Sequence, residues 1–263
     1  MRHSDFVPPI YQFLAENEWS LLERWFEETG RNNTVGELSI PFMSLVQGLV
    51  MGNRLKRIVQ IGTHCGYSAL LIGFMLRRMG IKSGLASIDL NERTTAFAAK
   101  YLKEAGLDEY VTLMVNDSRS PVTIRAARGC FQGGRPQMVI IDASHEYAQT
   151  LLELDSWYDA LEKGGFILLH DCSRFAQQLD PHGQGGVNAA FNQWVKANPG
   201  ITALSMDPGV IHEVVDEDAY SPDFSYQDGF GVGLVFKNME RHRLVRPMNA
   251  HNSKAADALF MKR

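Results

Sequence analysis

Apolar and polar positions change their spacing at about residue 56, and the new pattern persists through most of the remaining chain. Short runs that are apolar at nearly every position alternate with longer stretches whose apolar residues recur at helical spacing. Runs of the first kind are typical of strands that are covered on both faces. We expect strands at residues 57–61, 85–89, 111–115, 136–141 and 166–169. We expect helices at residues 67–79, 94–104, 121–128, 147–161 and 187–197.

This alternation predicts an α/β fold built on a doubly wound, mostly parallel sheet. Two further apolar runs, residues 201–205 and 231–236, bring the expected sheet to seven strands. Ligands in such sheets bind beyond the carboxyl ends of the strands, so the residues at those ends are the first candidates for chemistry. They are Gly62, Asp89, Asp117, Asp142 and Asp171.

The stretch before this pattern is helical in character. Residues 9–29 place their apolar side chains on one helical face, and Pro41 stands at the start of a second helix over residues 41–51. We therefore divide the chain into an N-terminal helical extension (1–54), a main domain (55–240) and a C-terminal tail (241–263). The extension is expected to cover the pocket of the main domain or to form an oligomer contact.

Charge and composition narrow the classes of protein that fit. The 263 residues carry 26 Lys and Arg against 30 Asp and Glu, and the resulting net charge of −4 argues against general nucleic-acid binding. The longest strongly apolar run, residues 69–76, is too short to cross a bilayer, and the N-terminus lacks the apolar segment of a secretory signal. Cys65, Cys130 and Cys172 form neither a disulfide framework nor a zinc pattern. We expect a cytoplasmic protein with no membrane and no nucleic-acid partner.

Three segments of the second half stand apart by composition. Residues 173–188 are rich in glycine and follow the fifth expected strand, so they form either a lid over the substrate or a plain connection. Residues 207–228 are acidic, and the tail from residue 241 is mildly basic. Both charged segments are interpreted as solvated surface.

A glycine-containing loop joins the first expected strand to the next helix, with the order Gln60-Ile61-Gly62-Thr63-His64-Cys65-Gly66-Tyr67-Ser68. Its glycines allow a tight turn and a close approach of the backbone to a ligand. A dinucleotide fingerprint requires glycine where His64 stands, so the spacing disfavours NAD. The loop instead resembles motif I of class I S-adenosylmethionine (SAM)-dependent methyltransferases, which has the form E-I-G-T-x-x-G-Y-S.

The resemblance implies SAM as the cofactor and the Rossmann-like methyltransferase fold. Gln60 stands where the family has Glu; its amide can hydrogen-bond the cofactor but lacks the charge that attracts a cationic amino group. Asp89 is placed to accept both ribose hydroxyls, and His64 is expected to shape the cofactor site rather than act as a catalyst. Asp117-Ser118 is expected at the adenine. The implied cofactor-binding residues are Gln60, Gly62, Thr63, His64, Gly66, Tyr67, Ser68, Asp89, Leu90, Asp117, Ser118 and Asp142.

A second motif is Ile140-Ile141-Asp142-Ala143-Ser144-His145. Further along the chain come Trp157, then Gly164-Gly165, and then the pair His170-Asp171. This pattern resembles the small-molecule O-methyltransferases that include the macrocin and mycinamicin sugar enzymes and the cephalosporin-biosynthesis protein, over residues 55–175. The resemblance implies Asp142 and Asp171 as metal ligands and His145 as the general base. His170 stands where that family has Glu, so the implied metal set is Asp142, His170 and Asp171.

The chemistry of methyl transfer accounts for these residue types. A hydroxyl group is a poor nucleophile while it keeps its proton, and a divalent ion on its oxygen together with a nearby His can remove that proton. Carboxylates favour Mg²⁺, whereas His170 as a ligand shifts the preference toward Mn²⁺, iron or zinc. We expect a SAM-dependent O-methyltransferase acting on the hydroxyl of a small metabolite, such as a sugar or a natural product. His145 and Asp142 are its catalytic candidates, Mg²⁺ or Mn²⁺ its candidate ions, and a homo-oligomer the family expectation.

Other interpretations stay open on the sequence alone. Asp142 could cap the following helix, His145 could form a local hydrogen bond, and the His170-Asp171 pair could hold a strand end. His145, His170 and one Asp could instead form the two-His-one-carboxylate iron site of a hydroxylase component. A non-catalytic partner subunit that keeps the fold is a further alternative, and N-methylation is not excluded.

Overall fold

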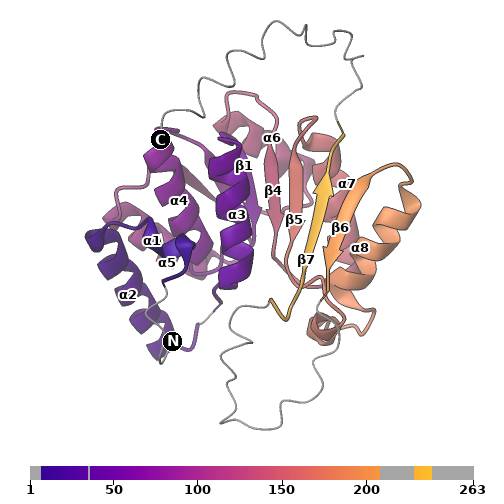
Figure 1. Ribbon diagram of the computed structural model, residues 1–263, viewed down its shortest axis with the longest axis horizontal. Helices are drawn as coiled ribbons and strands as arrows, with labels where there is room; N and C mark the ends of the chain where they lie inside the picture. The colour runs from indigo at the N-terminus through magenta and orange to yellow at the C-terminus, as the bar shows by residue number, and fades with distance from the viewer. Residues whose placement is uncertain (1–6, 35, 208–227, 239–263) are drawn as a thin grey trace, which may run out of the picture.

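The computed structural model describes residues 7–34, 36–207 and 228–238 (Figure 1). The seven strands are β1 (Ile58–Ile61), β2 (Leu85–Asp89), β3 (Val111–Val115), β4 (Met138–Ile141), β5 (Phe166–Leu169), β6 (Thr202–Met206) and β7 (Val232–Phe236). They form one sheet in the order β3-β2-β1-β4-β5-β7-β6. The first five strands are parallel, and β7 runs antiparallel to both β5 and β6. The predicted seven-stranded, mostly parallel α/β fold is confirmed.

The helices follow the predicted alternation closely. They are α1 (Pro9–Gln12), α2 (Glu16–Arg31), α3 (Ile40–Gly52), α4 (Tyr67–Met79), α5 (Glu92–Glu104), α6 (Pro121–Cys130), α7 (Tyr147–Ala160) and α8 (Gly186–Ala197), with a short 3₁₀ helix, η1 (Phe175–Leu179). The structure confirms the predicted bounds of α4, β2, β3 and β5. For β4 it confirms the predicted last residue. The glycine-rich connection after β5 contains η1, which the sequence did not predict.

One predicted helix is wrong in its extent, because residues 9–29 fold as two helices rather than one. The break falls at Ala15, whose backbone is extended with φ −73° and ψ 160°. The Glu18 carboxylate accepts a hydrogen bond from the Ala15 N–H at 2.8 Å and so caps α2. Apolar spacing alone could not find this break, since no glycine or proline lies there.

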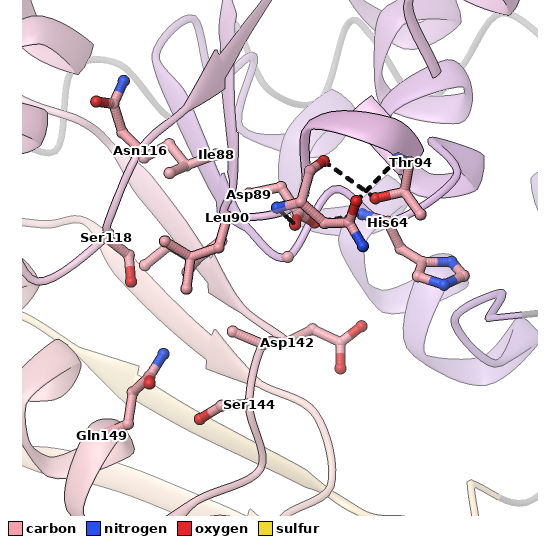
Figure 2. A pocket seen from close by; sticks show the side chains of 14 residues that line it. His64, Ile88, Asp89, Leu90, Thr94, Asn116, Ser118, Asp142, Ser144 and Gln149 are labelled. Atoms are coloured by element: carbon pink, nitrogen blue, oxygen red, sulfur yellow. Dashed lines mark hydrogen bonds between the residues drawn. The ribbon is translucent and has the colours of Figure 1, made fainter. Parts of the chain in front are cut away.

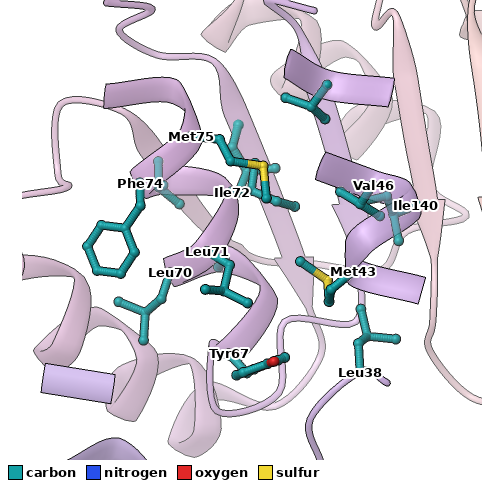
Figure 3. Close-up of a cluster of buried hydrophobic side chains, with 14 of the residues drawn as sticks. Leu38, Met43, Val46, Tyr67, Leu70, Leu71, Ile72, Phe74, Met75 and Ile140 are labelled. Atoms are coloured by element: carbon teal, nitrogen blue, oxygen red, sulfur yellow. The ribbon is translucent and has the colours of Figure 1, made fainter. Parts of the chain in front are cut away.

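Each face of the sheet carries its own core. Strand residues such as Ile58 and Ile140 pack under α3 and α4, where Met43, Val46, Leu70, Leu71 and Met75 fill the space between helices and sheet (Figure 3). Side chains of α1 and α2 join the same cluster. The opposite face, with Val59 and Ile141, packs against α6, α7 and α8. This doubly wound arrangement leaves the carboxyl edge of the parallel strands open for a site.

The acidic segment and the tail fall mostly beyond what the structure describes. Residues 208–227 and 239–263 lie outside the described ranges, so the predictions for them stay predictions. The division of the chain into three parts also stays a prediction. The N-terminal helices are placed, and they are continuous in packing with the main core through Ile10, Trp25 and Phe42.

Candidate active site

A cavity of about 290 Å³ lies at the carboxyl edge of β1, β2, β3 and β4, where the sequence placed the ligand site (Figure 2). Residues after each of these strands contribute to its wall. Six of the predicted cofactor residues line it: Gly62, His64, Asp89, Leu90, Ser118 and Asp142. The other lining residues are Ile61, Ile88, Asn91, Thr94, Asn116, Ala143, Ser144 and Gln149.

The loop after β1 can approach β4 closely because Gly62 has no side chain. Gly62 has φ +93°, and a Cβ there would lie 1.6 Å from the backbone oxygen of Asp142. Gly66, at φ +90°, precedes α4 and would bring a Cβ to 2.7 Å from the Cβ of Ala98. Both positions therefore require glycine on steric grounds. α4 begins directly after Gly66, and the first N–H groups of a helix have no partner within the helix.

Asp89 is fixed by backbone hydrogen bonds on both of its oxygens. Its Oδ2 accepts from the His64 N–H at 2.7 Å, and its Oδ1 accepts from the Asn91 N–H at 2.8 Å. Two lone pairs therefore remain on a carboxylate that is already oriented at the cavity wall. This is the arrangement that a pair of vicinal hydroxyl groups would need.

Four predicted cofactor residues lie behind the cavity wall. The buried Gln60 donates from Nε2 to the Gly62 carbonyl at 2.8 Å and to Ser68 Oγ at 2.5 Å. Thr63 Oγ1 is 2.7 Å from Ser87 Oγ, and the Tyr67 hydroxyl is 2.6 Å from that of Tyr11. These contacts shape the glycine loop and attach the N-terminal helices; direct contact of these residues with a cofactor stays a prediction.

The two residues predicted to follow β3 at the adenine are placed differently. Ser118 lines the cavity, whereas the Asp117 carboxylate forms an ion pair with Arg119 at 2.8 Å. The sequence analysis did not single out Asn116, Thr94 or Gln149. Their only sequence signal is position, since each lies within a few residues of a strand end or at the first turns of the following helix.

A second group of polar residues lies where β4 and β5 end, and we call Asp142, His145, His170 and Asp171 the strand-end cluster. His145 Nε2 lies 3.0 Å from Asp171 Oδ2 and 3.9 Å from Asp142 Oδ1. His170 Nδ1 lies 3.5 Å from Asp142 Oδ1 and 3.4 Å from Asp171 Oδ1. Asp142 also lines the cavity, so the cluster adjoins the candidate cofactor site.

His170 has a further carboxylate neighbour that the sequence analysis missed. Its Nε2 lies 3.3 Å from Asp228 Oδ2, at ion-pair distance but outside hydrogen-bond geometry. Asp228 Oδ2 also accepts a hydrogen bond from Ser39 Oγ at 2.6 Å. This hydrogen bond connects the segment before α3 to the loop before β7. The two segments lie far apart in the sequence, so no local sequence pattern predicts the contact.

Two members of the strand-end cluster hold strained backbone conformations. His145 has φ 59° and Asp171 has φ 58°, in the left-handed region that residues with a side chain seldom adopt. Strain of this kind is concentrated at functional sites, where the surrounding structure maintains it. The conformation turns both side chains toward the same point beyond the sheet edge.

The charges of the strand-end cluster are strongly coupled. Hydrogen bonding to Asp142 and Asp171 raises the pKa of His145 to about 10. Burial opposes the charge on His170, but Asp142, Asp171 and Asp228 raise its pKa to about 12. Burial likewise opposes the charges of Asp142 and Asp171, yet the two imidazolium groups lower both carboxyl pKa values. Both His side chains are therefore protonated at neutral pH in the ligand-free state.

The donor set fits a divalent metal ion at Asp142, His170 and Asp171, whose ligand atoms all lie within 4.8 Å of one another. His170 directs Nδ1 at both carboxylates and Nε2 at Asp228. A carboxylate on the distal nitrogen is the usual partner of a metal-bound imidazole. His145 is not a member of this group, although its Nε2 lies 3.0 Å from Asp171 Oδ2, so the two-His-one-carboxylate iron site stays an alternative prediction.

Known proteins resemble this chain in sequence and in fold. A family model described as a methyltransferase domain matches residues 59–172. The matched segment is similar to a methyltransferase domain. It begins in β1 and ends just after the strand-end cluster, so it contains every predicted catalytic, cofactor and metal residue.

Relatives with curated descriptions match part of this chain and part of their own length. A transmembrane O-methyltransferase homolog of Rattus norvegicus is 32% identical over 111 residues, which are 42% of this chain and 42% of that protein. The transmembrane O-methyltransferase of Homo sapiens is 33% identical over 84 residues, 32% of this chain and 28% of that protein. The chain thus matches less than half the length of these relatives.

Solved structures share the whole fold. The O-methyltransferase of Bacillus cereus in complex with SAH, the demethylated product of SAM, has a TM-score of 0.61 and 17% identity, covering 86% of this chain and 94% of that one. The O-methyltransferase TomG of Streptomyces achromogenes in complex with SAM has a TM-score of 0.60 and 19% identity, covering 86% and 91%. The sheet order β3-β2-β1-β4-β5-β7-β6 is typical of the methyltransferase fold. Across the described ranges, no helix is long and apolar enough to cross a membrane.

Proposed function

We propose that this protein is a SAM-dependent O-methyltransferase that methylates a hydroxyl group of a small molecule. The observation that carries the proposal is the junction of two features at one sheet edge: a cavity with a fixed carboxylate, Asp89, and an adjoining cluster of two His and two Asp residues. The methyltransferase-domain match over residues 59–172 and the O-methyltransferase relatives support the reaction class.

The cavity accounts for how SAM would lie. Asp89 would accept hydrogen bonds from the two ribose hydroxyls, because its oxygens are oriented by the N–H groups of His64 and Asn91. The methionine end would lie by Gly62 and Asp142, next to the strand-end cluster, and the base at the opposite end by Asn116 and Ser118. The methyl group would then face the acceptor, and positioning is the main contribution that such a site makes to methyl transfer.

The strand-end cluster accounts for how the acceptor would be activated. His145 Nε2 would take the hydroxyl proton, and Asp171 at 3.0 Å would hold the imidazole in place and stabilise its charge afterwards. A metal ion held by Asp142, His170 and Asp171 would lower the pKa of a hydroxyl group bound to it. Because His145 carries a raised pKa in the ligand-free state, it has to lose its proton before it can act as the base.

The acceptor and the assembly follow from the same proposal. We infer that the acceptor is a hydroxylated small molecule, with a sugar or a natural product as the first candidates. The resemblance to the macrocin and mycinamicin enzymes supports this choice of acceptor. We propose the same division of the chain into an N-terminal cap (1–54), a catalytic domain (55–240) and a C-terminal tail (241–263). A homo-oligomer and a cytoplasmic location stay predictions.

Formation of SAH tests the proposal. The protein is incubated with SAM and separate panels of hydroxylated and amine-bearing small molecules, with Mg²⁺, with Mn²⁺ and with a chelator, and SAH is measured. We expect SAH to form with at least one hydroxylated acceptor, and His145→Ala to abolish this turnover while SAH still binds. Transfer to amines alone, or full turnover in His145→Ala, would contradict the proposed reaction.

A further inference from the structure

A buried carboxylate, Glu153, lies directly behind one end of the cavity. It belongs to α7 and is 1% exposed. Its Oε1 accepts a hydrogen bond from Ser118 Oγ at 2.6 Å and another from Gln149 Nε2 at 3.0 Å. Burial raises the pKa of Glu153 above its usual value, which makes this a costly place for a carboxyl group. A residue kept there at a cost to stability invites a functional explanation.

Both partners of Glu153 line the cavity. Ser118 and Gln149 lie on the side away from His64, and their polar ends point toward one another (Figure 2). The backbone of Ser118 is fixed as well, because its carbonyl accepts a hydrogen bond from Trp157 Nε1 at 3.1 Å. The Ser118 hydroxyl and the Gln149 amide are therefore both held by residues of α7.

The direction of these hydrogen bonds decides what the cavity wall offers to a ligand. Ser118 uses its only hydroxyl proton on Glu153, so its oxygen is left with lone pairs. Gln149 donates one of its two amide N–H groups to the same atom, which fixes the orientation of the amide and leaves its carbonyl oxygen able to accept. Glu153 thus fixes Ser118 Oγ as an acceptor and orients the Gln149 amide beside it. This holds whether Glu153 is ionised or protonated on its other oxygen.

An acceptor wall selects a base that presents a hydrogen-bond donor. Under the proposed function, the methionine end of SAM lies by Asp142, so the base lies by Ser118. Adenine carries a 6-amino group, which donates, whereas hypoxanthine carries an oxygen at the same position, which accepts. A site built to hydrogen-bond one of two such groups rejects the other strongly, because its buried polar atoms are left unpaired.

We propose that Glu153 is a positioning residue that sets the base specificity of the cofactor site, by fixing Ser118 Oγ as an acceptor for the 6-amino group of adenine and by orienting the Gln149 amide beside it. The inference rests on the proposed function and deepens it. Glu153 itself touches neither the reacting atoms nor the open cavity, and it acts through its two partners.

The test compares the affinities of SAH and S-inosylhomocysteine, which differ only at position 6 of the base and the adjacent ring nitrogen. Both are titrated by calorimetry into the wild-type protein, Glu153→Gln and Glu153→Met. We expect the wild type to prefer SAH. Glu153→Gln keeps an oxygen where Oε1 accepts, so its preference should stay within about twofold of wild type. Glu153→Met keeps the length but loses the acceptor, so its preference should fall at least about tenfold.

Controls separate specificity from stability. Asp159→Ala removes an exposed carboxylate from the same helix and should leave the preference unchanged. Thermal unfolding of each variant shows whether it folds. If Glu153→Met does not fold, Ser118→Ala tests the inference instead, because it removes one acceptor and leaves Glu153 in place. Its preference should fall as well.

Three outcomes would overturn the inference. A folded Glu153→Met or Ser118→Ala protein that keeps the wild-type preference would show that the carboxylate does not set base specificity. A loss of preference in Glu153→Gln as large as in Glu153→Met would show that the acceptor at Oε1 is not what matters. Failure of the wild type to bind SAH at all would instead refute the proposed function, and the inference with it.

Discussion

At the scale of single residues, the two histidines and two aspartates of the strand-end cluster form a network of opposite charges at the ends of β4 and β5. Asp142, His145, His170 and Asp171 were found from strand ends and motif spacing, and the structure brings them within ion-pair distance. Asp228 was missed as a neighbour of His170, because its contact depends on a distant loop. Glu153 and Gln149 were missed because they lie in the regular spacing of a helix, where nothing local marks a buried carboxylate.

The protonation of His145 yields a prediction at this scale. We expect NMR titration of the metal-free protein to show His145 charged through pH 8, since hydrogen bonding to Asp142 and Asp171 raises its pKa to about 10. Asp171→Asn should lower that pKa by removing one negative charge. His182 is an exposed histidine for comparison. A His145 that titrates near its usual value of about 6.5 in the wild type would contradict the coupling.

The same shift makes stability depend on pH in a defined direction. A histidine whose pKa is raised in the folded state stabilises the fold fully below its unfolded pKa of about 6.5. That stabilisation is lost as the pH rises through the folded value of about 10. We expect the contribution of His145 to the free energy of unfolding of the metal-free protein to decrease over this window. Denaturant unfolding of wild type and His145→Gln at several pH values measures the difference, which should narrow toward high pH.

Glycine positions allow a matched test of the loop after β1. Gly62→Ala should abolish SAH binding or prevent folding, because a Cβ would lie 1.6 Å from the Asp142 carbonyl oxygen at a φ of +93°. Gly30→Ala meets nothing within 4 Å and lies in α2, so it should raise stability by about 0.5–1 kcal/mol. Calorimetry and thermal unfolding measure both. Normal SAH binding by Gly62→Ala would contradict the close approach of the two strands.

At the scale of elements, helix α2 is held to α4 by a buried carboxylate. Glu18 is 4% exposed and forms ion pairs with Arg77 and Arg78, which are about one-third exposed. Tyr11 and Tyr67 add a hydrogen bond of 2.6 Å between their hydroxyls, from α1 to α4. The periodicity of α2 predicted a helix with an apolar face, but the sequence did not show which helix that face would meet.

Glu18→Gln tests this attachment. Burial raises the pKa of Glu18, but hydrogen bonds from Arg78, the Ala15 N–H and Arg77 outweigh it, so the pKa lies below its usual value. The stabilisation is therefore present above about pH 4.3 and is lost as the pH falls through the folded value. We expect a loss of about 2 kcal/mol at pH 7, less than for a fully buried pair because both arginines are partly solvated. Denaturant unfolding measures it.

Glu16→Gln is the matched control, since Glu16 is exposed and lies two residues away in the same helix. Its effect should stay within about 0.5 kcal/mol. If Glu18→Gln and Glu16→Gln had equal effects, or if the cost of Glu18→Gln persisted at pH 2, the ion pairs would not be what attaches α2.

At the scale of the whole molecule, the sheet brings a candidate cofactor site and a candidate acceptor site next to each other. The cavity by β1, β2 and β3 carries the features of a cofactor site, and the strand-end cluster beyond β4 and β5 carries those of an acceptor site. Asp142 belongs to both. The sequence predicted this layout because parallel strands end at one edge. It could not predict the contact of Ser39 with Asp228, which closes over His170 from a segment far away in the chain.

The central claim, that this cavity binds SAM, is tested most directly by titrating SAH into chelator-treated protein by calorimetry, with Asp89→Ala alongside the wild type. We predict binding at one site per chain without metal, and at least tenfold weaker binding in Asp89→Ala, because the ribose hydroxyls lose both acceptors. The absence of binding to the folded wild-type protein at millimolar SAH would contradict the account.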